Sequence, residues 1–161
     1  YRVGLFMTQT IPNNKIELAK ESVAWQPCKL GKNLVIGANC TIGALAHIGS
    51  EVIIGDNCKI QGSAYIADRC VLGNNVFVGP NATLLNDKFP PSGTKQLWQP
   101  VTVNDGAVIG GGSTIVPGCN VGANAVLGAG AVLTKHLPDD EVWAGNPARF
   151  LMTRAEYESK R

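Results

Sequence analysis

Charged residues are scarce in this chain of 161 residues, at 16% Asp, Glu, Lys and Arg, and aromatic residues make up only 6%. The formal net charge is +2 and no stretch is dense in lysine or arginine, so the electrostatic footprint of a nucleic-acid-binding protein is missing. No run of 18 apolar residues occurs, and the sequence predicts no membrane-spanning helix. The start of the chain also lacks a basic segment followed by an apolar one, so we expect no signal peptide. Met7 is an alternative to Tyr1 as the natural start, which would exclude residues 1–6.

Glycine, by contrast, is abundant, with 19 residues, and it accompanies a strict period of six. An aliphatic residue recurs at every sixth position in two blocks, and a smaller side chain usually lies two residues before it. The blocks are Leu30, Ile36, Ile42, Ile48, Ile54, Ile60, Ile66, Leu72, Val78 and Leu84, then Val103, Ile109, Ile115, Val121, Leu127 and Leu133. Side chains at i and i−2 of a strand point to the same side, so each hexad is a short strand with two inward residues followed by a turn. Three hexads close a triangular coil, and the chain is predicted to be an all-β parallel β-helix.

The repeat also sets the predicted domain organisation, which is one domain over residues 1–161. The coils cover about 24–136, a loop covers about 85–100, and a tail covers 137–161. The period stops at Leu84 and resumes at Val103, which indicates a 13-residue insertion. The alternative, a degenerate coil, would bring Lys95 or Pro90 near the core. Repeat proteins often place function in such loops.

Both ends of the repeat are predicted to depart from it. Leu18 and Ala24 keep the period weakly, which suggests an imperfect first coil that caps the stack. In the tail, residues 141–149 are predicted to be extended. Residues 153–160 are predicted to form a short helix with Thr153 as N-cap and Glu156 three positions on.

All five cysteines fall in the smaller inward position of a hexad: Cys28, Cys40, Cys58, Cys70 and Cys119. They are interpreted as small buried apolar residues. The C-x-x-C spacing of a structural zinc site is missing, so we expect no metal. Free buried thiols are typical of a reducing cytoplasm, which is the predicted localisation.

The hexads, the closing run Val142-Trp143-Ala144-Gly145-Asn146-Pro147-Ala148-Arg149 and the loop entry together resemble the hexapeptide-repeat acyltransferases. Residues 77–90, reading FVGPNATLLNDKFP, are similar to the loop entry of the sugar-nucleotide N-acetyltransferases that act on a 3-amino group. The resemblance covers about residues 24–152 and implies left-handed coils and acetyl-CoA as donor. It also implies a UDP- or dTDP-linked amino sugar as acceptor, in lipopolysaccharide and other surface-polysaccharide biosynthesis. A homotrimer with active sites between subunits is implied as well. Relatives often carry Arg where this chain has Pro91, which weakens the case for a sugar carboxylate.

Three residues are candidates for the chemistry. Asn86 and Asp87 open the loop, and their side chains are expected to hold the acceptor amine and hydroxyls, whereas the alternative is a simple Asx turn. His47 has the ring pKa of a general base but lies two coils from the loop root, and an exposed surface histidine is the alternative. Tyr65, one coil further along the chain, is placed to stack on a nucleotide base. Asn81 and Lys88 complete the predicted substrate-binding set.

Doubled and tripled glycines exceed what the turns need. Gly110, Gly111, Gly112 and Ser113 precede Gly128, Ala129 and Gly130 by one coil, and small residues there would let an extended pantetheine arm lie along the stack. The predicted cofactor-binding residues are Gly111, Gly112, Ser113, Ala129, Gly130, Lys135 and Arg149. The last two are expected at CoA phosphates.

Four functions are weighed. An N-acetyltransferase can work without a protein base, because the departing thiolate can take the proton of a neutral amine. An O-acetyltransferase needs a base, for which His47 is the candidate. A γ-type carbonic anhydrase needs three zinc-binding histidines, and the chain has two. The protruding polar loop argues against a non-catalytic β-helix.

Overall fold

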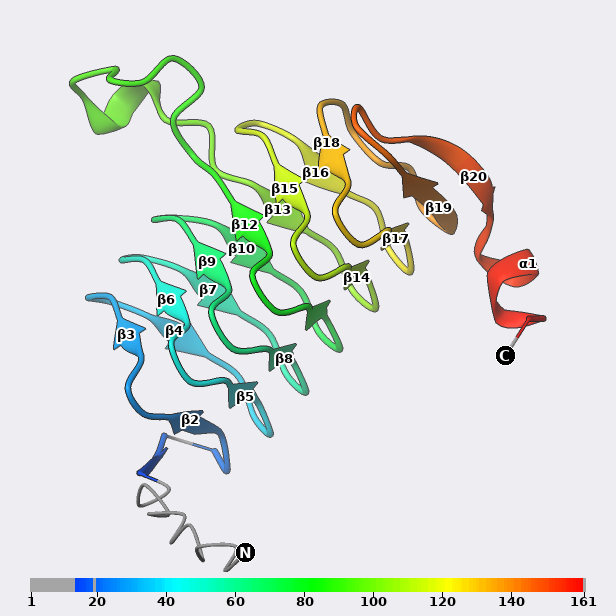
Figure 1. Cartoon of the computed structure of the whole chain (residues 1–161). Coiled ribbons are helices and arrows are strands. Elements are labelled where there is room, and N and C mark those ends of the chain that lie inside the picture. The colour runs from blue at the N-terminus through cyan, green and yellow to red at the C-terminus, as the bar shows by residue number, and fades with distance from the viewer. Residues whose placement is uncertain (1–13, 19, 161) are drawn as a thin grey trace, which may run out of the picture.

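The fold is a left-handed parallel β-helix with three flat faces (Figure 1). The structure is a computed structural model that describes residues 14–18 and 20–160, so Tyr1 and Met7 lie outside the described residues. Strands of two residues follow one another around the three faces in a fixed order, and each strand pairs in parallel with the strand one coil away. The predicted fold class is therefore confirmed.

Each face is one sheet. Sheet A comprises β1 (Lys15–Glu17), β2 (Val23–Trp25), β5 (Thr41–Ile42), β8 (Lys59–Ile60), β11 (Phe77–Val78), β14 (Val108–Ile109), β17 (Val126–Leu127), β19 (Glu141–Ala144) and β20 (Arg149–Thr153). Sheet B comprises β3 (Lys29–Leu30), β6 (His47–Ile48), β9 (Tyr65–Ile66), β12 (Thr83–Leu84), β15 (Thr114–Ile115) and β18 (Val132–Leu133). Sheet C comprises β4 (Val35–Ile36), β7 (Ile53–Ile54), β10 (Val71–Leu72), β13 (Thr102–Val103) and β16 (Asn120–Val121).

The inward positions form the core as the period predicts. Ile42, Ile48 and Ile66 are fully buried, and four of the five cysteines are buried beside such residues. Cys28 is the exception, because it lies in the first coils, where Leu30 and Ile36 are also only partly buried. All five thiols are free. Stacking of like residues thus produces one continuous apolar column through the described coils.

Tight corners connect the faces. Many corner residues hold a left-handed backbone, including Leu45 at φ 63°, Glu51 at φ 60° and Arg69 at φ 65°. Hydrogen bonds to the preceding coil hold these turns, such as Arg69 N–H to the Ser50 carbonyl at 2.9 Å. The ladder between coils therefore overrides the local preference for glycine or asparagine at positive φ.

The insertion lies at the corner between sheets B and C. Ile54 pairs with Leu72, 18 positions on, whereas Leu72 pairs with Val103, 31 positions on, and the difference is 13 residues. The extra chain leaves the stack after β12, contains the 3-10 helix η1 (Lys95–Leu97) and returns before β13 (Figure 1). Pro90 and Lys95 are exposed in it, so neither lies near the core.

The two ends differ from the simple repeat. At the start, β1 pairs antiparallel with β2, and Leu18 packs against the core beside fully buried Ala24. At the end, residues 141–149 are not one extended segment. β19 ends at Ala144, a turn with Gly145 at φ 93° follows, and β20 returns antiparallel. Helix α1 (Arg154–Glu158) begins after Thr153, which forms the expected capping box with Glu156.

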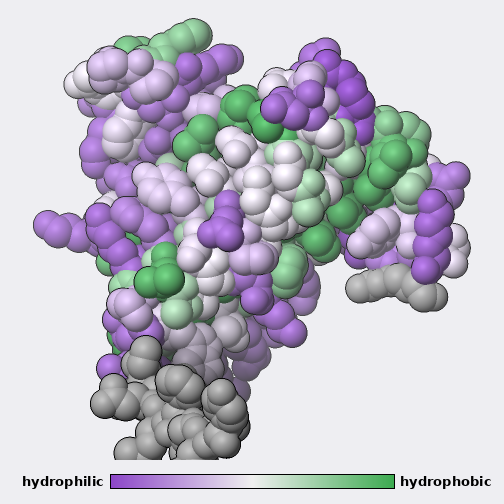
Figure 2. Space-filling model, in the orientation of Figure 1, coloured by the Kyte–Doolittle hydropathy of each residue, from purple (hydrophilic) through white to green (hydrophobic). Residues whose placement is uncertain are grey.

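Apolar side chains also point outward. Val35, Ile53 and Val71 share one column on sheet C, and Phe77, Val108 and Val126 share one on sheet A. Val126 is nevertheless only 4% exposed. A groove of about 600 Å³ passes beside it, lined also by Leu151, Met152 and Tyr157, and Figure 2 shows hydrophobic atoms gathered beside this C-terminal segment. Among the described residues, no helix is long and apolar enough to cross a membrane.

Candidate active site

Asn86 and Asp87 occupy the corner positions that Asp68 and Arg69 hold one coil earlier, because Tyr65 pairs with Thr83. The side-chain amide of Asn86 donates to the Asp68 carbonyl at 3.2 Å. Its own carbonyl accepts the Gln99 N–H at 2.6 Å, which closes the loop at its root. Asn86 thus lies where the stack and the loop meet.

Asp87 holds the loop internally. One carboxylate oxygen accepts the Phe89 N–H at 3.2 Å, and the other accepts the Ser92 N–H at 3.0 Å. The Ser92 backbone bond is the main reason that the pKa of Asp87 lies below its usual value. These contacts are those of an Asx turn, and a contact of Asp87 with an acceptor stays a prediction.

His47 and Tyr65 lie side by side on the outward face of sheet B, in one column with Lys29 and Thr83. The ring centroids of His47 and Tyr65 are 4.7 Å apart. Burial, followed by the charge of Lys29, lowers the pKa of His47 below its ordinary value. This shift favours the neutral imidazole, which can accept a proton.

The glycine-rich turns form the corner on the other side of sheet B. Gly130 N–H donates to the Gly111 carbonyl at 2.9 Å, so the two runs stack as predicted. Gly112 and Gly130 have φ of 66° and 67°, and a Cβ added at either would meet nothing within 4 Å. Asn81, at φ 57°, has a side chain at the equivalent corner one coil earlier. The fold therefore accepts a side chain in this column, and packing does not require glycine at Gly112 or Gly130. The two glycines leave the backbone accessible at this corner.

The structure places Ser113 differently from expectation, and the role of Arg149 at CoA phosphates stays a prediction. The Ser113 side chain is fully buried and its hydroxyl donates to the Gly110 carbonyl at 2.7 Å, so it does not face a ligand. Its slot is the small inward one of the hexad, which explains the burial. Arg149 is exposed at the start of β20, where it pairs with Ala144 beside Gly128, and its guanidinium donates to the Ala148 carbonyl at 2.8 Å.

Lys88 and Lys135 share one pocket, although the sequence assigned them to different ligands. It has a volume of about 400 Å³ and lies beside the loop, and His136, Gly118 and Cys119 also line it. His136 Nδ1 accepts the Asn120 N–H at 3.0 Å. Two ammonium groups facing one pocket favour an anionic ligand there, since both gain from the same negative charge.

Most of these residues border one surface. The outward face of sheet B carries His47 and Tyr65, the loop with Asn86, Asp87 and Lys88 lies along one edge, and the glycine corner with Asn81 lies along the other. We call this surface the B face. It offers a neutral imidazole, an aromatic ring, loop amides and open backbone, which suits binding of an extended polar ligand.

Sequence reasoning missed Lys29 in this column and the contacts that hold the loop at Asp68 and Arg69. The coil spacing contained a signal for Lys29 and for the Glu51–Arg69 pair. Lys29 lies one coil before His47, and Glu51 and Arg69, which have opposite charges, are also separated by one coil. A search for opposite charges at the coil period would have found the Glu51–Arg69 pair, whereas the contacts with Lys95 lie outside this period.

Comparison with known families agrees with the repeat. The profile of the bacterial transferase hexapeptide (six repeats) matches residues 33–68 and 51–86, and that of the hexapeptide repeat of succinyl-transferase matches residues 100–135. The chain therefore belongs to the hexapeptide-repeat acyltransferase family.

Individual relatives have acetyltransferase names. A protein of Saccharomyces cerevisiae, named provisionally as an acetyltransferase, is 36% identical over 89 residues, which cover 52% of this chain and 45% of that protein. PerB from Caulobacter crescentus, solved with CoA and GDP-perosamine, superimposes with a TM-score of 0.71 at 25% identity over 81% of this chain and 57% of PerB. A galactoside acetyltransferase in complex with coenzyme A gives a TM-score of 0.69 at 27% identity over 78% of this chain and 67% of that one. The chain thus spans less than half of the yeast relative.

Proposed function

We propose that this protein is an acetyl-CoA-dependent N-acetyltransferase acting on the amino group of a nucleotide-linked sugar. The observation that carries the proposal is the B face, where a polar loop opening with Asn86 lies across from an open glycine corner. The acetyltransferase names of the relatives support the donor, and the GDP-perosamine in PerB supports the acceptor class. A UDP- or dTDP-linked 3-amino sugar of surface-polysaccharide or lipopolysaccharide biosynthesis is the acceptor favoured by the loop-entry sequence.

The pantetheine arm of the donor would lie along Gly111, Gly112, Ala129 and Gly130, where missing side chains leave backbone within reach. An extended amide-containing chain can hydrogen-bond to backbone groups at such a corner. Arg149 lies on the same side of the coils, and Lys135 lies on the opposite edge, in the pocket with Lys88. Arg149 and Lys135 therefore cannot both bind the same phosphate group of one CoA molecule.

The chemical step needs few protein groups. The neutral amine attacks the thioester carbonyl carbon, an N–C bond forms, and the oxyanion is stabilised by a backbone N–H. The carbon–sulfur bond then breaks, and the thiolate leaves with the proton of the former amine, which yields the amide and free CoA. Holding the amine and the thioester in line supplies much of the rate. Asn86, at the junction of the stack and the loop, is the residue we assign to hold the acceptor.

O-acetylation is the second candidate, and one observation favours it. A hydroxyl is a weak nucleophile that needs a base, and the neutral form of His47 is favoured because burial and Lys29 lower its pKa. The distance of His47 from the loop, two coils by register, counts against a shared site. A sugar or small hydroxyl acceptor bound at His47 and Tyr65 would use the same donor.

A homotrimer is the assembly that we propose from the same geometry. The outward apolar side chains of Phe77 and Val108 on sheet A are suited to cover the B face of another copy, which would give a homotrimer with active sites between subunits. A single copy leaves the B face open on one side.

The test is a panel of acceptors assayed for CoA release with acetyl-CoA. It contains UDP- and dTDP-linked 3-amino sugars without a carboxylate, the matching 3-hydroxy sugars, and a galactoside. Transfer to the amines alone is the expected result. Transfer to the hydroxy sugars or the galactoside alone would replace the proposal with O-acetylation.

A further inference from the structure

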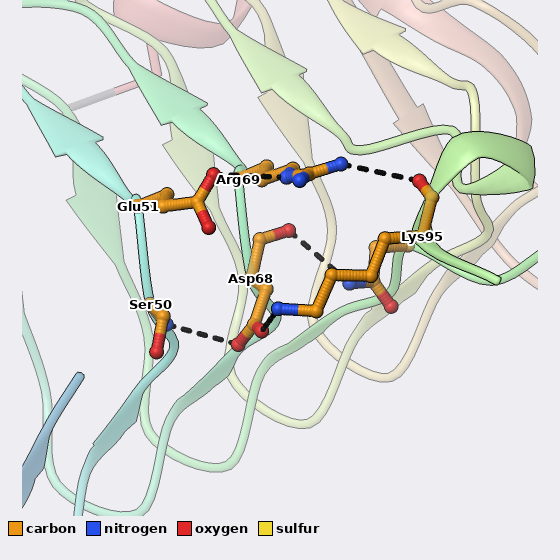
Figure 3. A network of polar contacts seen from close by, with 6 residues as sticks. Ser50, Glu51, Asp68, Arg69 and Lys95 are labelled. Atoms are coloured by element: carbon orange, nitrogen blue, oxygen red, sulfur yellow. Dashed lines mark hydrogen bonds and ion pairs between the residues drawn. The ribbon is translucent and has the colours of Figure 1, made fainter. Parts of the chain in front are cut away.

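A network of polar contacts ties the inserted loop to the two preceding coils (Figure 3). We call it the loop latch and define it by Glu51, Asp68, Arg69, Lys95 and Trp98. Glu51 and Arg69 occupy equivalent corners one coil apart, and both have positive φ. Lys95 and Trp98 belong to the returning arm of the loop.

Arg69 is the centre of the latch. Its Nε donates to Glu51 Oε2 at 3.0 Å, and a terminal guanidinium nitrogen donates to the Lys95 carbonyl at 3.1 Å. The guanidinium carbon also lies 6.0 Å from the centroid of the Trp98 ring, within the range of a cation–π contact. One side chain thus connects an acidic residue of the stack to the returning arm, and only the forked donor set of arginine allows both bonds.

Asp68 provides a second arm from the neighbouring backbone position. Its carboxylate accepts the Ser50 N–H at 2.9 Å and lies 3.8 Å from the Lys95 ammonium group. Its backbone carbonyl accepts the side-chain amide of Asn86 at 3.2 Å. The entry of the loop at Asn86 and its return at Lys95 are therefore both fixed to the dipeptide Asp68-Arg69.

We propose that Arg69 is a positioning residue for acetyl transfer, because its bridge from Glu51 to the Lys95 carbonyl fixes the loop and thereby Asn86. This inference rests on the proposed function. With the bridge present, the returning arm cannot move away from the stack without breaking the hydrogen bond from Arg69 to the Lys95 carbonyl and the contact of Arg69 with the Trp98 ring. Without it, the loop keeps its root at Gln99 and Asn86 but loses its brace.

The kinetic pattern separates positioning from direct binding. A misplacement of about 1 Å can cost on the order of 100-fold in rate. Arg69→Gln should therefore lower kcat by about 10- to 100-fold while the KM values of donor and acceptor change by less than about threefold. An Arg69 that bound an acceptor phosphate directly would instead raise the acceptor KM and leave kcat near normal, and this would overturn the proposal.

Arg69→Lys distinguishes the two bonds of the bridge. Lysine keeps a charge opposite Glu51 but lacks the fork needed to reach the Lys95 carbonyl as well. The kcat of Arg69→Lys should be nearly as low as that of Arg69→Gln. A normal kcat would contradict the bridge from Glu51 to the Lys95 carbonyl. Lys59→Gln, which removes an exposed cation from sheet A, is the matched control and should behave as the parent chain.

Limited trypsin digestion reports on the loop without any assay of transfer, since Lys88 and Lys95 are cleavage sites within it. Arg69→Gln should be cut in the loop at least about tenfold faster than the parent and Lys59→Gln. Faster cutting together with the loss of kcat supports the proposal. Unchanged cutting, or faster cutting with normal kcat, overturns it. If the parent transfers to no acceptor in the panel while cutting still depends on Arg69, the proposed function fails and the latch remains as the brace of the loop.

Discussion

The imidazole of His47 lies 4.7 Å from the phenol ring of Tyr65, centroid to centroid, and the two planes are inclined by 38°. This pair is set by the register of β6 and β9, which places the two residues opposite each other. Burial, followed by the charge of Lys29, lowers the pKa of the imidazole and so favours its neutral form. A neutral ring packed on an aromatic one has two possible uses, as a base for a hydroxyl or as a surface for a flat ligand.

We predict that His47→Asn keeps most of kcat with an amino-sugar acceptor, because the leaving thiolate takes the proton. Asn86→Ala should cost far more, on the order of 100-fold, since it removes the contact with Asp68 and the group that we propose holds the acceptor. Asp87→Ala should also lower kcat, because two loop amides lose their acceptor. Steady-state kinetics of the three variants check this.

The opposite ranking of the kcat losses would identify His47 as a general base, because a general base contributes about 100- to 10,000-fold to the rate. A thousand-fold loss in His47→Asn, with Asn86→Ala and Asp87→Ala near normal, would disprove the loop-centred mechanism. It would place the chemistry at His47 and favour O-acetylation.

The glycine corner gives a second prediction. Gly112→Asn places a side chain where a Cβ has open space, and Asn81 shows that asparagine adopts this backbone one coil earlier. The variant should stay as stable as the parent but raise the KM for acetyl-CoA at least about tenfold. Ser63→Asn is the matched control in the same column, two coils from Gly112, and should leave KM unchanged. A normal KM in Gly112→Asn would remove the pantetheine arm from this corner.

A third prediction concerns the core cysteines. Cys58 is fully buried, and burial raises its pKa to about 11. Labelling by a thiol reagent at pH 8 should therefore be slow at Cys58 and fastest at partly exposed Cys28. Cys58→Ala should cost little stability, whereas Cys58→Leu should overpack the slot and cost about 1–3 kcal/mol in denaturant titration. Rapid labelling of most thiols in the native protein would contradict the burial.

The coils could be predicted from the sequence because one physical requirement repeats. Ile48, Ile66 and Leu84 follow one another at the coil distance, and each must enter the same core. The turn at Gly145 could not be found this way, because it lies past the last hexad, where no period constrains the chain. The burial of Val126 could not be found from the period either. The C-terminal segment that lies beside it folds back by a turn that the period does not encode.

The candidate site was predictable only in part. The column of His47 and Tyr65 follows from the coil period, and the Thr153 cap follows from local chemistry. The meeting of Lys88 with Lys135 does not, because the inserted loop has no period and its path depends on contacts such as that of Arg69 with Lys95. Ser113 was assigned to the cofactor because it follows three glycines, although it occupies the smaller inward position of its hexad, which predicts burial.

A fourth prediction is that the protein is a homotrimer, with three times the 17.0 kDa mass of one chain. Light scattering at micromolar concentration measures this. Phe77→Asp should dissociate the trimer, because it places a charge on the apolar column of sheet A. Thr41→Asp, in the same outward column two coils away, should not. A monomeric parent chain would leave the B face without a second wall and would contradict the shared site.

The fifth prediction concerns the pocket that holds Lys88 and Lys135. If the 3′-phosphate of CoA binds there, acetyl-dephospho-CoA should show a KM raised about tenfold in the parent chain, because a charge-assisted contact is lost. In Lys135→Gln the KM values of acetyl-CoA and acetyl-dephospho-CoA should differ by less than about twofold. Lys20→Gln, which removes an exposed cation near β2 in the first coil, is the control, and its KM values for the two donors should differ as much as those of the parent. If instead Lys135→Gln leaves the donor preference intact and raises only the acceptor KM, the pocket binds the diphosphate of the nucleotide sugar. Arg149, on the other side of the coils, would then be the remaining candidate for the CoA phosphates.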